Sequence, residues 1–338
     1  MSPLVERDFF GDLPSEITTN ILSRLPIRSL AISKSVCKPW LNLIDSDYFH
    51  KSEIKTPPAL LLFTGKTMDS TCCSIFEIED EDEVEVEKSH DFHHIPLMDL
   101  EIPHGNRATM EGITANGLLL LCPISTKAIP VYICNPITRE YTKLCFPADY
   151  IPGHMLEFGL GVSKISGEYK VVCINESTNS RYVYTLGTGT WRRVEAGAAS
   201  ECFRTFSIPP VGDGARDWYL SVLRDCLCYF YTRESEIVIW KMKDYQVEDS
   251  WTMEYRLSTV GFDFDLDDMY LHPIRHFKDG DILMLLVEYD LIYYSSKTRT
   301  FQQVGMFKVG SASFLSALIF TPSLFSLRNF GFENVISF

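Results

Sequence analysis

Two short patterns in the chain place side chains that could bind a phosphate or a metal ion. Gly65-Lys66-Thr67 is similar to the end of a phosphate-binding loop, but position 60, where that loop needs its first glycine, is a leucine. The acidic run 263–268 begins like a calcium loop. It has Asp268 where the loop needs a turn glycine and Ile274 where it needs the twelfth-position glutamate. Both patterns therefore predict ordinary turns or loops.

The histidines and the candidate nucleophiles give no stronger indication of a metal site or a catalytic site. His90, His93 and His94 lie close together, but neither cysteines nor a second spaced cluster accompany them, as a zinc site would require. The chain has no Gly-x-Ser-x-Gly elbow, and no set of serine, histidine and aspartate has the pattern of a catalytic triad. The sequence therefore predicts a protein that is not an enzyme and that uses no cofactor and no metal.

The stretch 13–49 is patterned to contact another protein instead. Its apolar residues recur at steps of three and four, which gathers them on one face of a helix bounded by Pro14 and Pro26. That face carries Leu13, Ile17, Ile21, Leu22 and Leu25, and the opposite face carries Ser15, Glu16, Thr18, Thr19, Asn20 and Arg24. Two further short helices are predicted, one within 27–35 and one from Pro39. A unit this small buries too little surface to fold alone, so we expect a partner to supply the rest.

These three helices resemble the F-box, the adaptor-binding module of Skp–cullin–F-box ubiquitin ligases. The matching residues are Leu13-Pro14-x-Glu16-Ile17, Ile21-Leu22-x-Arg24-Leu25-Pro26, Leu30, and Val36-Cys37-Lys38-x-Trp40-x-x-Leu43-Ile44. The resemblance implies an F-box domain over residues 8–55 that binds a Skp-type adaptor. Its adaptor-binding residues would be Leu13, Pro14, Ile17, Ile21, Leu22, Leu25, Pro26 and Leu30. The alternative is a helical cap that belongs to the following domain.

Charge excludes several classes of partner. The net charge is −14, and eight acidic residues fall within 77–87. Because nucleic-acid binding depends on basic side chains that displace counterions, we expect no nucleic-acid partner, and an anionic membrane surface is equally unsuited. The acidic run itself has two interpretations, a solvated surface loop or a docking strip for a basic client protein.

Compartment signals agree with an intracellular protein. The N-terminal residues are charged and lack the apolar region of a secretory signal, and the longest apolar runs, such as 282–287, are far shorter than a membrane span. The ten cysteines are spread along a large chain and include the adjacent pair Cys72-Cys73 and the alternating Cys226-x-Cys228, which indicates small apolar core residues in a reducing compartment. We expect localisation in the nucleus, the cytoplasm or both.

After residue 57 the pattern changes to short apolar runs separated by glycine, asparagine and proline, which is typical of an all-β domain. The clear runs are Ala59–Phe63, Leu118–Leu121, Val131–Cys134, Lys170–Ile174, Arg181–Leu186, Leu227–Tyr231, Ile237–Met242, Ile282–Val287 and Leu291–Tyr294. Aromatic residues recur 50, 60 and 50 positions apart at Tyr141, Trp191, Trp251 and Phe301. That period predicts a kelch-like β-propeller of about five or six blades, with a β-sandwich pair as the alternative.

A second resemblance covers residues 57–327. The segments that carry it are Gly112–Leu119, Ile133–Tyr141, Phe158-Gly159 with Glu168–Val172, and Phe320–Leu324, which look like the F-box-associated domain of plant F-box proteins. Within them, Asn116-Gly117 and Asn135-Pro136 have the residue types of tight turns between strands. The resemblance implies a kelch-like interaction domain that recruits a client protein. Residues 328–338 match neither family pattern and are expected to form a C-terminal tail.

Together the sequence predicts a small α-helical F-box followed by an all-β domain. The function implied by the two resemblances is substrate recognition in a Skp–cullin–F-box ubiquitin ligase, with cullin and RING subunits reached through the adaptor. Candidate client contacts are the segments 149–156, 206–218 and 263–272. The alternative function is an adaptor-bound interaction protein that yields no ligase output.

Overall fold

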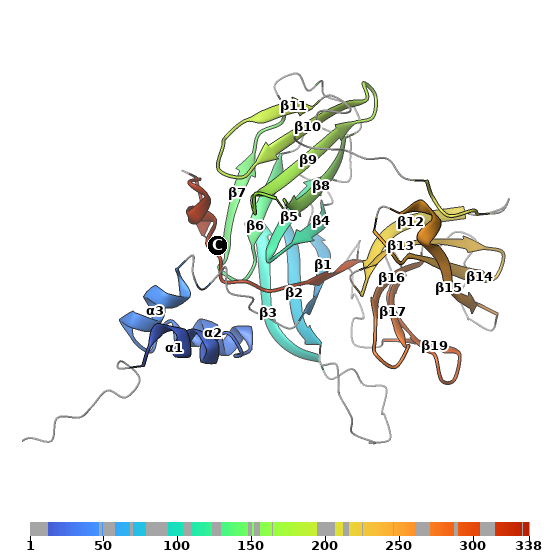
Figure 1. Ribbon diagram of the computed structural model, residues 1–338, viewed down its shortest axis with the longest axis horizontal. Helices are drawn as coiled ribbons and strands as arrows, with labels where there is room; N and C mark the ends of the chain where they lie inside the picture. The colour runs from blue at the N-terminus through green and yellow to red at the C-terminus, as the bar shows by residue number, and fades with distance from the viewer. Residues whose placement is uncertain are drawn as a thin grey trace, which may run out of the picture.

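A computed structural model describes most of the chain and shows a helical unit beside an all-β domain (Figure 1). The described residues are 13–46, 49, 58–67, 70–78, 94–103, 110–123, 130–147, 151, 156–163, 165–194, 207–211, 216–224, 226–245, 247–260, 271–286, 290–304, 315–332 and 334–337. The helices are α1 (Ser15–Leu22), α2 (Ile27–Ser33) and α3 (Lys38–Ile44). The acidic run after Ile78, the sequence 263–268 and the junction 51–57 lie outside the described residues.

A proline lies at the start of each of the three helices, as the sequence predicts. Pro14 and Pro26 precede the first residues of α1 and α2, and Pro39 lies in the first turn of α3. A proline is tolerated at these positions because the first N–H groups of a helix have no intrahelical acceptor. The Pro14 carbonyl oxygen accepts the backbone N–H of Ile17 and that of Thr18, each at 3.1 Å. The three predicted helices are confirmed.

The β-domain is a propeller of five blades, each a sheet of antiparallel strands. Blade I contains β1 (Ala59–Thr67), β2 (Ser70–Ile78), β3 (His94–Pro103) and β20 (Leu315–Phe320). Blade II contains β4 (Met110–Ala115), β5 (Leu118–Pro123), β6 (Val131–Asn135), β7 (Glu140–Leu144) and β21 (Ile336–Ser337). Blade III contains β8 (Leu156–Val162), β9 (Tyr169–Asn175), β10 (Ser180–Thr185) and β11 (Trp191–Val194).

Blades IV and V complete the domain. Blade IV contains β12 (Arg216–Leu223), β13 (Cys226–Arg233), β14 (Glu236–Met242) and β15 (Trp251–Ser258). Blade V contains β16 (Leu271–His276), β17 (Ile282–Leu286), β18 (Asp290–Ser295) and β19 (Thr300–Gln303). Two 3-10 turns, η1 (Glu248–Ser250) and η3 (Leu327–Phe330), precede β15 and β21.

The predicted propeller is confirmed in preference to the β-sandwich. Every apolar run named from the sequence lies in a strand or overlaps one. The four aromatic anchors lie in β7, β11, β15 and β19, each of which is the fourth strand of its blade in chain order. Blade I combines strands from the beginning and the end of the domain, because β20 pairs with β1 over six residues from Leu315 to Phe320. The first strand of the blade therefore comes from near the C-terminus.

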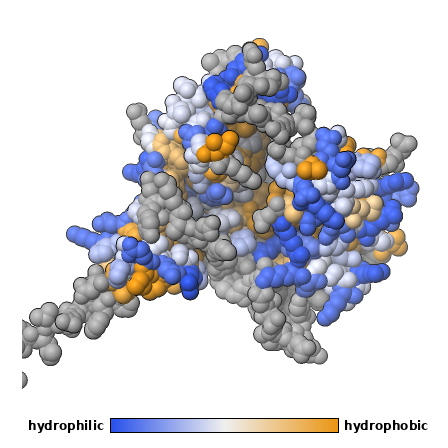
Figure 2. Space-filling view, viewed as in Figure 1, coloured by the Kyte–Doolittle hydropathy of each residue, from blue (hydrophilic) through white to orange (hydrophobic). Residues whose placement is uncertain are grey.

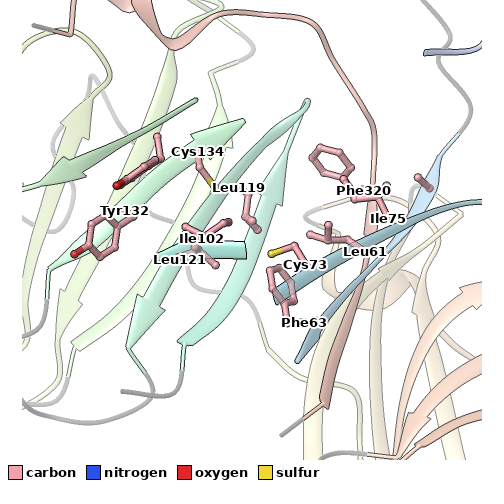
Figure 3. Packing of buried hydrophobic residues seen from close by; sticks show 12 residues of the cluster. Leu61, Phe63, Cys73, Ile75, Ile102, Leu119, Leu121, Tyr132, Cys134 and Phe320 are labelled. Carbon is pink, nitrogen blue, oxygen red and sulfur yellow. The ribbon is translucent and has the colours of Figure 1, made fainter. Parts of the chain in front are cut away.

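Blades I, II and V each have two apolar faces, and each of these faces packs on a neighbouring blade. In β1, Leu61 and Phe63 face blade II, whereas Leu60 and Leu62 face blade V. Figure 3 shows the first of these contacts, where Phe63, Ile75 and Phe320 of blade I share a core with residues of blade II. Because both faces are buried, these strands are continuous apolar runs instead of alternating ones. Similar clusters join blade II to III and blade IV to V.

A repeated hairpin turn connects strands in three blades. Residues Asn135, Asn175 and Ser295 end a strand, and each accepts a hydrogen bond through its side-chain oxygen from the backbone N–H three residues later. The fourth turn residue then has a left-handed backbone, at Arg139, Asn179 and Arg299. This turn geometry directs the chain back into the next strand, which then pairs in the register of a tight hairpin. Asn116-Gly117, with φ values of 41° and 84°, forms the predicted turn between β4 and β5.

The described residues of the predicted C-terminal tail, 328–332 and 334–337, pack on the propeller. Leu327 is fully buried, η3 begins at that residue, and β21 pairs with β7 through Ile336 and Tyr141. A boundary between residues 327 and 328 therefore cuts through packed structure. The sequence carries no local sign of this pairing, because the partner strand lies almost 200 residues earlier.

Burial of His272 makes the stability of the propeller depend on pH. The ring lies against Tyr219 of blade IV, and its Nε2 atom has no hydrogen-bond partner among the described residues. Burial lowers the pKa of His272 from 6.5 to about 4. Between these values the unfolded chain binds a proton that the folded chain does not, so acidification favours unfolding.

We expect the free energy of unfolding to decrease as the pH falls from 6.5 towards 4, and His272→Phe to remove part of that decrease. Urea unfolding of both proteins at pH 7 and pH 5 measures the difference. Equal losses of stability in the parent and the variant would contradict the assignment to His272.

Candidate functional site

The helix α1 has two faces with different roles. Thr18, Thr19 and Leu22 are buried, whereas Ile17 and Ile21 are 48% and 49% exposed. The sequence pattern places the two threonines on the face opposite the apolar residues, and the structure shows that they are buried. Their short side chains fit beneath the helix, and the Thr18 hydroxyl donates to the Pro14 carbonyl oxygen at 3.2 Å. The isoleucines are thus left on the open face.

The helical unit has a small core of its own. Leu22, Ile27, Leu30, Ile44 and Phe49 are buried together, with Leu25, Trp40 and Leu43 packed at the edge. Two residues of the propeller, Ile137 and Leu324, complete this cluster. The contact provides part of the surface that the short helices cannot bury among themselves.

The eight predicted adaptor-binding residues fall into three groups in the structure. Pro14, Ile17, Ile21 and Pro26 are exposed, Leu13 and Leu25 are partly buried, and Leu22 and Leu30 are buried. The exposed group offers apolar surface to a partner directly. The two buried leucines hold α1 and α2 in the helical core, where they are 0% and 2% exposed.

Three further apolar side chains are exposed on the helical unit. Ile32 and Val36 are 62% and 61% exposed, and Leu41 is 38% exposed. Figure 2 shows apolar surface gathered over the helices at the lower left of the molecule. Helical spacing could have identified Ile32, because it follows the buried Leu30 by two positions and must point to a different side.

The surface around these residues is basic, in contrast to the rest of the chain. Residues 13–46 carry four basic and two acidic side chains, a net charge of +2 (4 − 2) within a chain of −14. The basic residues are Arg24, Arg28, Lys34 and Lys38, and the acidic ones are Glu16 and Asp45. Lys34 and Asp45 form an ion pair at 2.5 Å between Nζ and Oδ1. An apolar face on a helical unit of net positive charge suits a protein partner that carries complementary acidic groups.

The propeller exposes a second apolar surface on β12. Trp218, Leu220 and Val222 alternate along this strand and are 61%, 46% and 63% exposed. The intervening Tyr219 and Leu223 pack on the cluster shared with blade V. The Trp218 ring stacks on Tyr229 with centroids 6.2 Å apart, which holds it at a defined position on the blade.

The side chains tested for chemistry form no site in the described part of the chain. No group of three or more histidine, cysteine, aspartate or glutamate residues there could hold a metal ion. Gly65-Lys66-Thr67 ends the strand β1, instead of joining a strand to a helix. The triplet His90, His93 and His94 lies outside the residues with described side chains. Among the described helices, none is long and apolar enough to cross a membrane.

The buried cysteines behave as core residues. Nine cysteines in the described residues carry free thiols, and five of them, Cys73, Cys122, Cys134, Cys173 and Cys228, are buried. Burial raises the pKa of Cys173 to about 12 and that of Cys228 to about 11, since the thiolate is poorly solvated there. These thiols stay protonated at neutral pH and have no nucleophilic character.

Family models match both parts of the chain. Residues 10–52 match the F-box domain, and residues 60–208 match the F-box associated beta propeller domain. The chain is an F-box protein. The F-box thus corresponds to the helical unit with the exposed Ile17 and Ile21, and the associated domain corresponds to the propeller.

Relatives of this F-box protein occur in Arabidopsis thaliana. F-box protein At5g07610 is 29% identical over 69% of this chain and 57% of its own length. F-box protein At2g23160 is 26% identical over 83% of this chain and 87% of its own length. The putative F-box/kelch-repeat protein At1g15680 is 28% identical over 54% of this chain and 46% of its own length. The chain spans 46% to 63% of the length of the first three relatives that it matches.

Solved structures resemble the fold only distantly. Prolyl oligopeptidase B from Galerina marginata overlaps 77% of this chain and 41% of its own with 9% identity and a TM-score of 0.33. A protein of unknown function from Bacteroides caccae gives a TM-score of 0.26 with 11% identity over 74% of each chain. Similarity at this level supports no inference about function.

Neighbouring residues of α1 should differ sharply in their effect on stability. We expect Leu22→Ala to destabilise the F-box by about 2 to 5 kcal/mol because it leaves a cavity, and Ile21→Ala to change it by about 0.5 kcal/mol or less. Hydrogen exchange of the backbone amides in residues 15–44 measures both. Similar protection losses in the two variants would show that α1 is oriented differently.

Proposed function

We propose that this F-box protein is the substrate-recognition subunit of a Skp–cullin–F-box ubiquitin ligase. The observation that carries the proposal is the pair Ile17 and Ile21, which remain half exposed although the F-box core and its contact with the propeller are already complete. Together with Pro14 and Pro26 they form an apolar face that a Skp-type adaptor would cover. The adaptor would connect the chain to the cullin and RING subunits.

The propeller would hold the client protein. Its exposed stripe Trp218, Leu220 and Val222 supports this role, because a tryptophan anchored on a rigid strand is the kind of residue that dominates protein interfaces. Trp218 is also the last residue of the candidate client segment 206–218. The segments 149–156 and 263–272 remain candidates, and they lie largely outside the described residues.

The chain would contribute proximity and no bond-making step. Ubiquitin transfer would occur on the other subunits, and this chain would raise the effective concentration of a client lysine near the activated ubiquitin. The proposal assigns it no catalytic residue and no cofactor. Such a complex would act in the nucleus, the cytoplasm or both.

The second candidate function is an adaptor-bound interaction protein that sequesters its client without ubiquitination. It uses the same two surfaces, so binding alone does not distinguish it from the ligase role. The two differ only in whether a bound client receives ubiquitin.

The adaptor proposal predicts a selective loss of binding. We expect the double variant Ile17→Asp, Ile21→Asp to bind a Skp-type adaptor at least about tenfold more weakly, because two carboxylates would enter an apolar interface. Ile165→Asp is the matched control, since Ile165 is 96% exposed on the propeller. Isothermal titration with purified adaptor measures each affinity, and thermal unfolding verifies the fold. Equal affinities in the parent and the double variant would contradict the proposal.

The ligase proposal can be tested before the natural client is known. A nanobody that binds green fluorescent protein is fused to the chain, and the fusion is combined with adaptor, cullin, RING subunit, activating and conjugating enzymes and ubiquitin. We expect ubiquitin on the fluorescent protein with the parent chain and about tenfold less with the Ile17→Asp, Ile21→Asp variant. A complete complex that holds the fluorescent protein unmodified would favour the sequestering role.

A further inference from the structure

The residues after β20 run across the propeller as an extended segment and reach the F-box. We name residues 321–337 the C-terminal strap. Figure 1 shows the chain leaving β20 and crossing in front of β1, β2 and β3 towards the helices. Along this path Leu324 enters the F-box core, Phe325 and Phe330 pack on Tyr169 of blade III, and β21 joins the edge of blade II. The strap therefore touches both folded parts of the protein.

Asn135 holds the strap by hydrogen bonds to the residues on both sides of Leu324. Its side chain is fully buried, and its Nδ2 group donates to the carbonyl oxygen of Ser323 at 3.0 Å and to that of Phe325 at 2.7 Å. The Oδ1 atom meanwhile accepts the backbone N–H of Ile137 at 2.9 Å. One amide thus satisfies the turn of its own hairpin and two backbone carbonyls of the strap.

Glu140 fastens the next residues of the strap. The residue is 8% exposed, and its carboxylate accepts hydrogen bonds from the Ser326 hydroxyl at 2.9 Å and from the backbone N–H of Leu327 at 2.7 Å. Arg328 lies 3.5 Å from the same carboxylate through Nε. Charge-assisted hydrogen bonds of this kind compensate for the burial of the negative charge and give the strap a fixed register on β7.

Two glycines show how closely the strap fits. A side chain on Gly117 would lie 2.1 Å from the Ser323 hydroxyl, and one on Gly187 would lie 2.4 Å from the Phe330 carbonyl oxygen. Both glycines also have left-handed backbones, with φ values of 84° and 90°. The turns of blades II and III therefore leave room for the strap only because these positions lack a side chain.

The fastened segment points Leu324 into the F-box. Its neighbours on each side are held by Asn135, and its side chain is 7% exposed among the buried residues of the F-box. Ile137, two residues beyond Asn135, belongs both to this cluster and to the core between blades I and II. The hairpin turn that holds the strap thus also contacts the F-box directly.

We propose that the C-terminal strap fixes the orientation of the F-box on the propeller, with Asn135, Glu140 and Leu324 as positioning residues. These three touch neither the exposed adaptor face nor the stripe on β12. If the proposed ligase function holds, on which this consequence rests, they set the direction in which a client is presented to the transferred ubiquitin. The proposal itself concerns the free chain and needs no partner.

The test measures distances between spin labels on the full chain without adaptor. Labels are introduced as noncanonical amino acids because the chain has ten cysteines. One pair, at Arg28 of the F-box and Ser177 of blade III, reports the orientation between the two parts. A second pair, at Ser177 and Lys297 of blade V, reports the propeller alone. All three positions are exposed.

Two variants weaken the strap in different ways. Asn135→Asp keeps the acceptor oxygen of the turn and removes the donor to the strap, and Leu324→Ala removes the apolar contact with the F-box. We expect each to broaden the Arg28–Ser177 distance distribution at least about twofold, because loosely held domains sample many orientations. The distribution for the pair within the propeller should remain narrow.

Matched controls separate this effect from general destabilisation. Asn175→Asp changes the equivalent turn asparagine of blade III, and Leu286→Ala removes a leucine buried between blades IV and V in a cluster that contains no strap residue. Both should leave the Arg28–Ser177 distribution as narrow as in the parent. A narrow distribution in Leu324→Ala would overturn the proposal, as would equal broadening in the controls. If Asn135→Asp also broadens the propeller pair, Leu324→Ala alone decides the outcome.

A separate titration with adaptor distinguishes this proposal from the proposed function. Both strap variants should bind the adaptor as the parent does, since Ile17 and Ile21 are unchanged. Failure of the parent to bind adaptor would remove the ligase role and leave the distance result standing.

Discussion

Burial on both faces is the constraint on which this structure depends. A blade such as β4–β7 is a single sheet with apolar side chains on each side, and it has no core until a neighbour covers each face. Alternate residues of one strand therefore belong to different cores, as Leu60 and Leu61 do. Stability is shared between adjoining blades, and β20 pairs with β1 to complete blade I.

The same constraint governs the F-box. The helical unit buries five apolar side chains, four of them on the three helices and the fifth at Phe49, and Leu324 and Ile137 complete the cluster. The helices are thus anchored on the propeller through their inner face, and their outer face keeps Ile17, Ile21 and Ile32 in solvent. Exposure of isoleucine side chains to water is unfavourable in free energy. Binding of a partner that covers them removes this unfavourable contribution.

Local patterns in the sequence predict a large part of this structure. The proline positions, the continuous apolar runs and the recurring aromatic residues are short-range signals, and they indicate the helices, the strands and the blade period. The inward position of Thr18 and Thr19 is not predictable in this way, because it depends on what lies beneath α1. The burial of Leu22 and Leu30 is unpredictable for the same reason, because helical spacing alone does not tell which apolar side of a helix faces inward.

Long-range contacts are even harder to predict from the sequence around each residue. Asn135-Pro136 has the composition of a turn, and nothing in its neighbourhood reveals that the amide of Asn135 also holds residues 323 and 325. Glu140 likewise resembles a surface residue of a polar turn until the strap covers it. Both roles come from a segment nearly 190 residues later in the chain, so they become visible only in three dimensions.

The buried cluster that Leu22 shares with Leu324 also has a consequence for the order of synthesis. The two leucines are 302 residues apart (324 − 22), so at ordinary translation rates the F-box waits on the order of tens of seconds for the residue that completes it. A chain that stops before residue 315 lacks both β20 and the strap, yet it retains Ile17 and Ile21. Such a fragment would occupy an adaptor without a properly placed propeller, and would compete with the finished protein.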